Sequence, residues 1–245
     1  METMRIAGSS RRRNALITVS MLCVAVVVGP LHADDASYLQ PGQVDPIAIL
    51  PPPPAPDSVE QTVDLATVES VQKAASVADR AAANSQEHLT VFAFAPVIGA
   101  FFRASTLPKT EAFFGRVAAT AESMTRPAKA YFKRDRPYVV DPNLGVKHPE
   151  HNYSYPRGHS TLGTVDALVL ADLFPDKRAE ILAFGRAIGW HRIQLGKHYP
   201  TDVYAGRVLA QAIVRELKSS PAFQHDFAAA KSELEAASPP THSSP

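Results

Sequence analysis

Helix-forming segments separated by prolines constrain this chain more than any other feature of its sequence. Apolar residues recur three or four positions apart, which predicts helices over residues 61–83, 90–102, 109–136 and 200–218 and further helices from residue 160 and after Pro175. No segment alternates apolar and polar residues as a half-buried strand does, and no internal repeat is present. We therefore expect an all-α fold, a compact helical bundle.

Prolines also set the limits of individual helices. Pro137 excludes the helical conformation from the residue before it, so the helix over 109–136 is expected to end there. Pro127 lies inside that helix and predicts a kink or a break. The apolar segment 90–102 is too short to span a bilayer and predicts a buried helix bent at Pro96.

The first 33 residues have the pattern of a secretory signal peptide. Arg5 and Arg11–Arg13 form a basic region, Ala15–Gly29 carries no charge, and a small residue, Ala33, ends the segment. The apolar run is short for a membrane span, so a membrane anchor is the less favoured alternative. We expect export to the periplasm. Cys23, the chain's one cysteine, would be removed with the segment, which leaves no disulfide.

The sequence predicts four parts: a signal peptide (1–33), an extended proline-rich arm (34–57), one globular domain (58–237) and a disordered tail (238–245). Pro51–Pro54 impose an extended polyproline conformation on the arm. The apolar Ile47, Ile49 and Leu50 lie next to them, which favours an arm packed on the domain over a loose linker. The formal net charge of +1 gives no reason to expect a nucleic-acid partner.

Three clusters of polar residues carry the chemistry. The first is Lys129 with Arg136 and Pro137. Residues seven apart on a helix lie on nearly the same face, about 10 Å apart along the axis, so these two cations are expected to share a face. A solvated basic face is the alternative interpretation, because other cations lie nearby.

The second cluster is the segment Pro156–Ser160. Gly158 would let the backbone approach a ligand closely, and His159 follows it. A helix capped by Ser160 or Thr161 would present free N–H groups to an anion. A turn followed by an incidental histidine is the alternative.

The third cluster is Arg192, His198 and Asp202. Pro200 suits the first position of a helix with Tyr199 as its cap, which places His198 just before a helix N-terminus. Asp202 falls in the first turn, where its carboxylate can keep one imidazole nitrogen protonated and leave the other with a free lone pair. Such a histidine can act as a nucleophile. Alternatively, Asp202 is only a favourable charge at a helix N-terminus.

Together the clusters supply what phosphoryl transfer requires. Lys129, Arg136 and Arg192 provide three fixed positive charges for the phosphate oxygens, and two helix N-termini provide backbone donors. One histidine can attack while the other protonates the leaving oxygen, and this chemistry requires no metal. The residues alone do not decide which histidine attacks. A paired acid and base predicts a bell-shaped rate profile, with its optimum expected below neutrality.

The three clusters, in this order and spacing, resemble the signature of the type 2 phosphatidic acid phosphatase (PAP2) superfamily, which includes the vanadium haloperoxidases. Both ends of the mature chain resemble the bacterial class A non-specific acid phosphatases. The resemblance implies a helical, periplasmic, commonly homo-oligomeric enzyme that hydrolyses small phosphate monoesters through a phosphohistidine, with a phosphotransferase side activity and without cofactor or metal. It gives His198 the attack on phosphorus, Asp202 its orientation and His159 the general-acid role. It assigns phosphate binding to Lys129, Arg136, Arg192 and Gly158.

Two positions depart from the family's pattern. Arg157 stands between the proline and glycine of the second cluster, and His191 stands before the arginine of the third, where the family usually has serines. Arg157 is expected to act as a further phosphate-binding cation or to turn outward to the rim. His191 is expected to replace a serine hydrogen bond or to fill space behind the site. Substrate range and pH optimum are the properties that these residues would change.

Other functions have less support. A zinc site is disfavoured because no histidine pair has the spacing of a zinc protease and basic residues dominate the region. A membrane lipid phosphatase would need several apolar spans, which the mature chain lacks. A vanadate-dependent haloperoxidase would share the site, and a phosphate-binding protein without turnover would keep the cations. Both stay open as alternatives.

Overall fold

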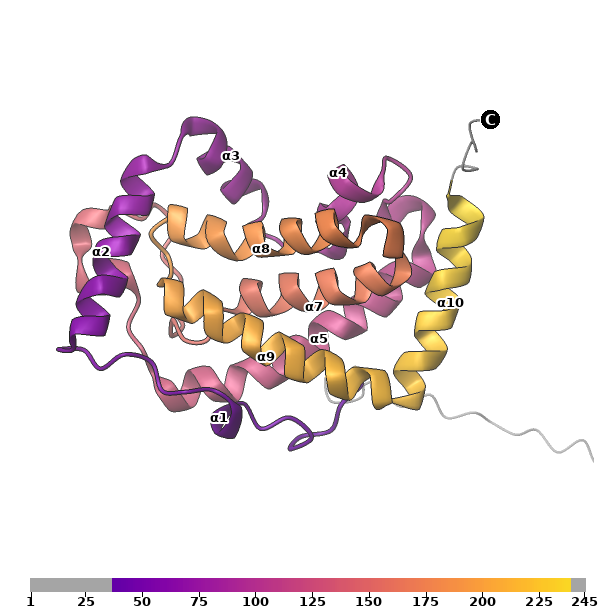
Figure 1. Cartoon of the computed structure of the whole chain (residues 1–245), viewed down its shortest axis with the longest axis horizontal. Helices are drawn as coiled ribbons and strands as arrows, with labels where there is room; N and C mark the ends of the chain where they lie inside the picture. Colours follow the sequence, from indigo (N-terminus) through magenta and orange to yellow (C-terminus); the bar gives the residue numbers. More distant parts are fainter. Residues whose placement is uncertain (1–36, 239–245) are drawn as a thin grey trace, which may run out of the picture. The chain divides into compact units, whose positions relative to one another are not determined.

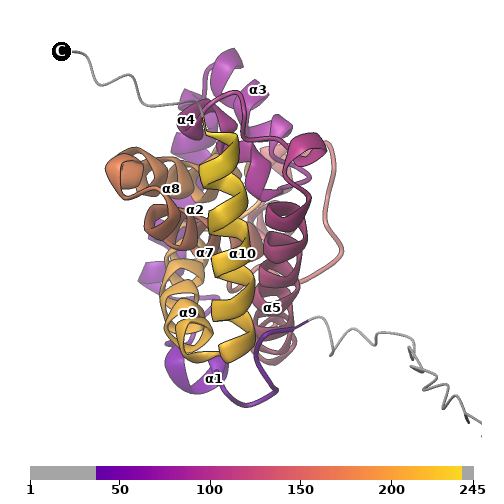
Figure 2. The ribbon, with the colours of Figure 1, turned by 90° about the vertical axis from the view of Figure 1, so that its right-hand side faces the viewer.

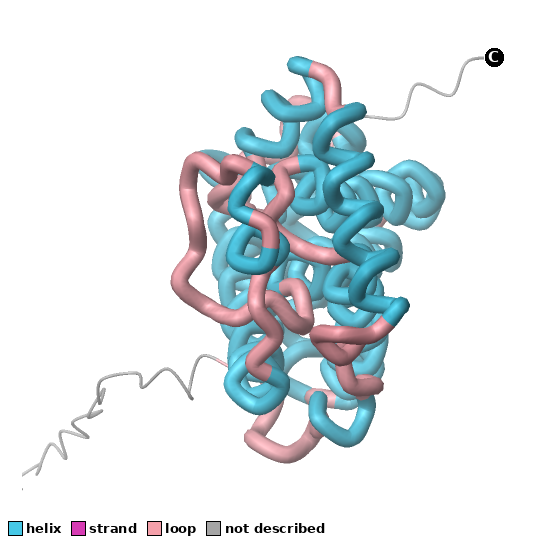
Figure 3. Tube along the Cα trace, turned by 90° about the vertical axis from the view of Figure 1, so that its left-hand side faces the viewer, coloured by secondary structure: helices cyan, strands magenta, loops and turns pink. Residues whose placement is uncertain are grey.

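The computed structural model describes residues 37–238, and every regular element within them is a helix (Figures 1 and 3). The α-helices are α1 (Pro46–Ile49), α2 (Val59–Ala74), α3 (Val77–Ser85), α4 (Ala95–Ile98), α5 (Pro108–Phe132), α6 (Pro137–Val140), α7 (Gly158–Leu173), α8 (Arg178–Gln194), α9 (Pro200–Ser219) and α10 (Pro221–Ala237). The 3-10 helices are η1 (Val91–Phe94), η2 (Ala104–Thr106), η3 (Pro142–Leu144) and η4 (Pro175–Lys177). The all-α prediction is confirmed. The predicted signal peptide and nearly all of the predicted tail lie outside the described residues.

Helix α7 lies at the centre, against α8 on one side and α9 on another (Figure 1). Glycines allow this close packing. A Cβ at Gly185 of α8 would lie 2.8 Å from the carbonyl oxygen of Gly163 on α7, and one at Gly206 of α9 would lie 2.6 Å from the carbonyl oxygen of Arg157. Because α7 and α9 each begin beside the other, their N-termini meet at one end of the bundle.

The long helix α5 crosses α7 and also packs against α10, which follows α9 after a sharp turn and contacts it there (Figures 1 and 2). Phe113 of α5 and Phe223 of α10 contribute buried aromatic rings to the shared core, with centroids 5.3 Å apart. Pro127 lies inside α5 without ending it. The helix ends instead at Phe132, because Lys133 adopts the left-handed conformation with a φ of 49°. The expectation of a helix reaching Arg136 is therefore wrong.

Two other predicted helices are divided. The segment 61–83 forms α2 and α3, because Ser76 accepts a hydrogen bond from Asp79 N and the Asp79 carboxylate accepts one from Ser76 N. This reciprocal cap starts a new helix. The segment 90–102 is a 3-10 turn followed by the short α4, which begins near Pro96 and ends at Gly99, where φ is 134°. Pro96 therefore starts a helix rather than bending one.

The proline-rich arm lies on the domain. Tyr38, Leu39 and Leu50 are buried in the main apolar core, and the Tyr38 amide donates to Thr120 Oγ1 of α5 over 2.9 Å. The Tyr155 hydroxyl donates to the carbonyl oxygen of Pro51 over 2.6 Å. Of the three apolar residues next to the prolines, Leu50 is buried, which agrees with a packed arm, whereas Ile47 and Ile49 are exposed.

None of the described helices has the length and apolar character needed to cross a membrane.

Candidate active site

His198 lies in the turn between α8 and α9 and is fully buried. Gly196, with a φ of 69°, reverses the chain after α8, and Pro200 then begins α9 with Tyr199 in extended conformation before it. This local geometry agrees with the helix start that the sequence predicted. It brings the imidazole to the point where α7 and α9 begin.

The contacts of His198 define its tautomer. Nε2 lies 2.8 Å from Arg136 Nη1 and also within hydrogen-bonding distance of Arg157 Nη1. A guanidinium can only donate, so Nε2 must carry the lone pair and Nδ1 the proton. Nδ1 lies 3.3 Å from Asp202 Oδ2 and 3.1 Å from Ser154 Oγ. Burial and then the cations Arg157 and Arg136 lower the pKa of His198 well below its usual value, so the ring is neutral.

Asp202 is fully buried and surrounded by donors. Oδ2 accepts from Tyr199 N over 2.9 Å and from Ser154 Oγ over 2.5 Å, and Oδ1 accepts from Arg134 Nη1 over 2.7 Å. Arg134 in turn binds Asp64 of α2 over 2.7 Å. The carboxylate is thus both the partner of the imidazole and one end of a buried ion-pair network. Neither Ser154 nor Arg134 was identified from the sequence.

Three guanidinium groups converge beside His198, those of Arg136, Arg157 and Arg192, and each of these residues is at most 2% exposed. Arg157 therefore points inward, so the alternative of a rim position is wrong. Several of their N–H groups, Arg157 Nε and Nη2 and Arg192 Nε and Nη1, are buried without a hydrogen-bond partner among the described residues. Buried donors without partners are costly, which indicates a site shaped for an anion.

One carboxylate lies in this cation cluster. Glu150 Oε2 is 2.7 Å from Arg136 Nη2 and 3.3 Å from Arg157 Nη1, and Oε1 is 3.1 Å from Arg192 Nη2. A fourth cation, buried Lys197, has its Nζ 4.0 Å from Oε1. Burial alone would raise the pKa of Glu150, but the three arginines and Lys197 outweigh it and hold that pKa well below its usual value.

Lys129 reaches the site from α5, whereas Arg136 lies beyond the end of that helix. The prediction that the two cations share a helical face is wrong, because Lys133 ends the helix between them. The Lys129 ammonium donates to the carbonyl oxygens of Tyr153 and, over 3.4 Å, Ser154. Burial, then Arg157 and Arg136, lower the pKa of Lys129 to about 7.

Helix α7 begins at Gly158, two residues before the predicted cap. Ser160 donates instead to the carbonyl oxygen of Val203 over 2.7 Å and Thr161 to that of Arg157 over 3.0 Å. A Cβ on Gly158 would meet no atom within 4 Å beyond its chain neighbours and the backbone of its own helix, and this glycine lines a cavity. The first turn of α7 is thus open toward the site, as a helix N-terminus must be to bind an anion.

His159 lies in that first turn and lines the same cavity. Its Nε2 is 3.1 Å from the carbonyl oxygen of Glu87, to which a neutral ring can donate. Burial, then Arg157 and Arg192, lower the pKa of His159 to about 3. The unliganded site therefore holds this histidine neutral.

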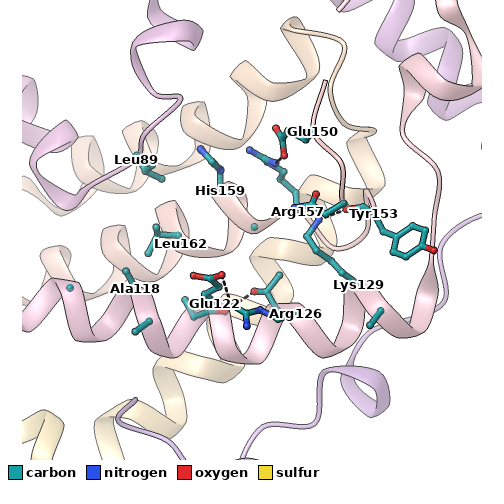
Figure 4. Close-up of a pocket in the computed structure, with 17 residues that line it drawn as sticks. Leu89, Ala118, Glu122, Arg126, Lys129, Glu150, Tyr153, Arg157, His159 and Leu162 are labelled. Carbon is teal, nitrogen blue, oxygen red and sulfur yellow. Dashed lines mark hydrogen bonds and ion pairs between the residues drawn. The ribbon is translucent and has the colours of Figure 1, made fainter. Parts of the chain in front are cut away.

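The cavity measures about 880 Å³ and runs along α5 (Figure 4). Lys129, Glu150 and Arg157 lie at one end, His159 is in the middle, and apolar side chains such as Leu89, Leu162 and Ala118 line the other end. His198 does not line this cavity.

His191 is directed elsewhere. Its Nδ1 lies 2.8 Å from Gln86 Oε1 at the end of α3, and it makes no hydrogen bond to the cation cluster. Within residues 37–238, no group of three or more His, Cys, Asp or Glu side chains lies together as a metal site would require.

Sequence reasoning missed Glu150, Ser154, Arg134 and Lys197. One signal was available, since Glu150 is the only carboxylate between Asp141 and Asp166 in a region rich in cations. Ser154 and Arg134 carry no comparable signal, because their roles depend on contacts with residues distant in the sequence.

The PAP2 superfamily pattern matches residues 111–224. A non-specific acid phosphatase of Providencia stuartii is 31% identical over 216 residues, covering 82% of this chain and 85% of that protein. One of Salmonella typhimurium is 30% identical over 231 residues, covering 89% of each. A bacterial vanadium-dependent iodoperoxidase has a similar fold, with a TM-score of 0.50 and 18% identity over 68% of this chain and 52% of that one. The chain belongs to the PAP2 superfamily and, within it, to the family of the bacterial non-specific acid phosphatases.

Proposed function

We propose that this chain is an acid phosphatase that hydrolyses phosphate monoesters through a phosphohistidine on His198. The observation that supports this most directly is the lone pair on His198 Nε2, which faces the buried guanidinium groups of Arg136 and Arg157 while Nδ1 faces Asp202. A phosphate bound by those cations would present its phosphorus to the nitrogen. The names of the two bacterial phosphatases agree with this activity.

The reaction has two steps. In the first, Nε2 attacks phosphorus and the bond from phosphorus to the ester oxygen breaks. His159 gives a proton to that leaving oxygen, while Arg136, Arg157, Arg192 and Lys129 balance the charge on the other phosphate oxygens. In the second, His159 takes a proton from water, whose oxygen attacks phosphorus and breaks the P–N bond. Inorganic phosphate leaves and His198 is regenerated. An alcohol in place of water would give phosphotransferase side activity.

The cavity along α5 has room for the leaving group. Its apolar end, which includes Leu89, Leu162 and Ala118, continues directly from the end that holds Arg157 and Lys129. No cofactor takes part in this scheme. We also keep the periplasm as the proposed location and a homo-oligomer as the proposed state, on the grounds of the N-terminal pattern and the family.

The test is release of phosphate from p-nitrophenyl phosphate in EDTA between roughly pH 4 and 8. Turnover supports the proposal. Phosphate binding without turnover would support the binding-protein alternative. Oxidation of bromide by peroxide, observed only with added vanadate, would support the haloperoxidase alternative.

Replacing His159 with asparagine should slow the reaction by a factor that depends on the leaving group. General acid catalysis contributes about 10²–10⁴-fold, so kcat/KM with glycerol phosphate, which reports the first step and not the hydrolysis of the phosphohistidine, should fall by an amount in that range. The loss of kcat/KM with p-nitrophenyl phosphate should be much smaller, because nitrophenolate leaves without a proton. Parallel measurements of kcat/KM on the two substrates provide the comparison.

The same variant should also change the pH dependence of kcat. In the free site the cations hold the pKa of His159 at about 3, and a bound phosphate dianion would raise it. In the wild type kcat should therefore fall as pH rises and His159 loses its proton in the complex. His159→Asn should lack this alkaline fall in kcat. Equal losses on both substrates with an unchanged pH profile would exclude His159 as the acid.

A further inference from the structure

Glu150 occupies the place that the proposed function gives to phosphate. Its two oxygens lie within 3.3 Å of guanidinium nitrogens of Arg136, Arg157 and Arg192, and Lys197 Nζ is 4.0 Å away. Every one of the three arginines proposed to bind phosphate therefore already has an anionic partner. A substrate phosphate must compete with that partner.

Glu150 is accessible from the cavity, whereas the proposed nucleophile is not. The side chain is 26% exposed and lines the cavity together with Arg157, whereas His198 is fully buried and does not line it. The residues after Glu150 also contact cations of the site. Asn152 accepts hydrogen bonds from Arg136 through its backbone and side-chain oxygens, and the carbonyl oxygens of Tyr153 and Ser154 accept from Lys129. In this arrangement the imidazole of His198 is not exposed to the cavity.

The carboxylate fits the cation cluster incompletely. Arg157 Nη2 and Arg192 Nη1 remain buried and without a partner among the described residues, although Glu150 lies beside both side chains. A carboxylate has two oxygens in one plane, whereas a phosphate monoester offers three terminal oxygens in a tetrahedral arrangement. A phosphate could therefore satisfy more of these donors than Glu150 does.

The backbone and the side chain of Glu150 are held by separate contacts. The hydroxyl of Tyr138 donates to the Glu150 carbonyl oxygen and accepts from the Glu150 amide, both over 2.9 Å. These two bonds fix the loop to the residues of α6. The carboxylate itself is held by its ion pairs, so rotation of the side chain toward the cavity would uncover the arginines.

We propose that Glu150 is an internal competitor of phosphate. Its carboxylate binds the arginines in the free enzyme, swings away when a phosphate enters, and so sets the affinity for substrate and for product. The inference rests on the proposed function for the identity of the anion. A site that is open only a fraction of the time binds its ligand more weakly by that fraction, so a site closed ~90% of the time loses about tenfold in affinity.

The first test is binding of inorganic phosphate to Glu150→Gln, measured by calorimetry. Glutamine keeps the size of the side chain and removes its charge, so phosphate should bind about tenfold more tightly than to the wild type. Glu122→Gln is the matched control. Glu122 lines the same cavity but pairs with Arg126 and not with the cluster, so the same loss of charge should leave phosphate affinity nearly unchanged.

Kinetics provide a second readout. If Glu150 competes with phosphate, Glu150→Gln should lower KM for the phosphate monoester about tenfold, the same factor as for binding of inorganic phosphate. If the ion pairs of Glu150 were purely structural, Glu150→Gln would instead lower thermal stability and leave phosphate affinity unchanged. Unchanged or weaker phosphate binding by Glu150→Gln would overturn the proposal.

A further variant keeps the test valid if Glu150→Gln does not fold. Tyr138→Phe removes the hydroxyl that holds the Glu150 backbone and should tighten phosphate binding in the same direction, by a smaller factor. If the folded variants bind phosphate no more tightly than the wild type, the proposal is wrong. Measuring phosphate binding separates this question from catalysis. Tighter phosphate binding by Glu150→Gln without any turnover would contradict only the proposed function. Normal turnover with unchanged phosphate affinity would contradict only the role of Glu150.

Discussion

Replacing His198 with alanine should lower kcat by on the order of 10⁴-fold or more, since it removes the atom that would bond to phosphorus. The fold should persist, because the lost ring is neutral and the three arginines keep Glu150 as their partner. Inorganic phosphate should still bind, since the cations remain. Turnover of p-nitrophenyl phosphate, circular dichroism and phosphate calorimetry on the same preparation measure the three properties.

A trapping experiment makes this prediction specific to the chemistry. Rapid quenching of the wild type with labelled phosphate monoester should leave label on His198, in an acid-labile and alkali-stable bond. His198→Ala should retain none. His225→Ala is the control, because His225 is an 84% exposed side chain on α10 and should turn over and label as the wild type does. Near-wild-type turnover by His198→Ala would rule out the phosphohistidine mechanism.

The sequence predicted the surroundings of His198 because the signals there are local. A proline at the first position of α9 and an aspartate in its first turn determine where the helix begins and where the carboxylate lies. The resulting contact between His198 Nδ1 and Asp202 Oδ2, at 3.3 Å, spans only one helical turn. Gly158 and His159 were likewise predicted to lie near a helix start, although α7 begins two residues before the predicted cap.

The end of α5 could not be predicted in the same way. A lysine, not a glycine, adopts the left-handed conformation at residue 133, and helix-ending propensity gives lysine no such role. Packing then turns the chain, so that the carbonyl oxygen of Arg134 accepts from Ser154 N over 2.9 Å. Lys129 and Arg136 still meet at the site, but by this turn rather than by a shared helical face.

Glu150 and Ser154 lie in a segment without regular structure. Hydrophobic periodicity gives no information there, and the segment is positioned by contacts with Arg134, Arg136 and Tyr138, which precede it in the sequence. The sequence could not predict that the carboxylate of this segment would enter the cation cluster, since that depends on three arginines brought together only by folding.

Asp202→Asn should lower kcat by roughly 10²–10⁴-fold through a change of tautomer. Both oxygens of Asp202 face obligatory donors, Arg134 Nη1 at Oδ1 and Tyr199 N at Oδ2. An asparagine can offer its oxygen to one of them only. With the oxygen toward the guanidinium, the NH₂ group faces His198 Nδ1, which must then accept, so the proton moves to Nε2 and the nucleophilic lone pair is lost.

This variant should also be less stable, so a second variant is needed to separate stability from chemistry. Asp64→Asn weakens the other ion pair of Arg134, which joins Nη2 to Asp64 Oδ2 over 2.7 Å, and leaves Asp202 and His198 intact. Breaking a buried ion pair costs roughly 3–5 kcal/mol, so both variants should unfold at lower denaturant concentration. Only Asp202→Asn should also lose kcat, measured well below the unfolding transition. If Asp64→Asn loses as much kcat as Asp202→Asn, then Asp202 acts through the buried ion-pair network and not through the imidazole.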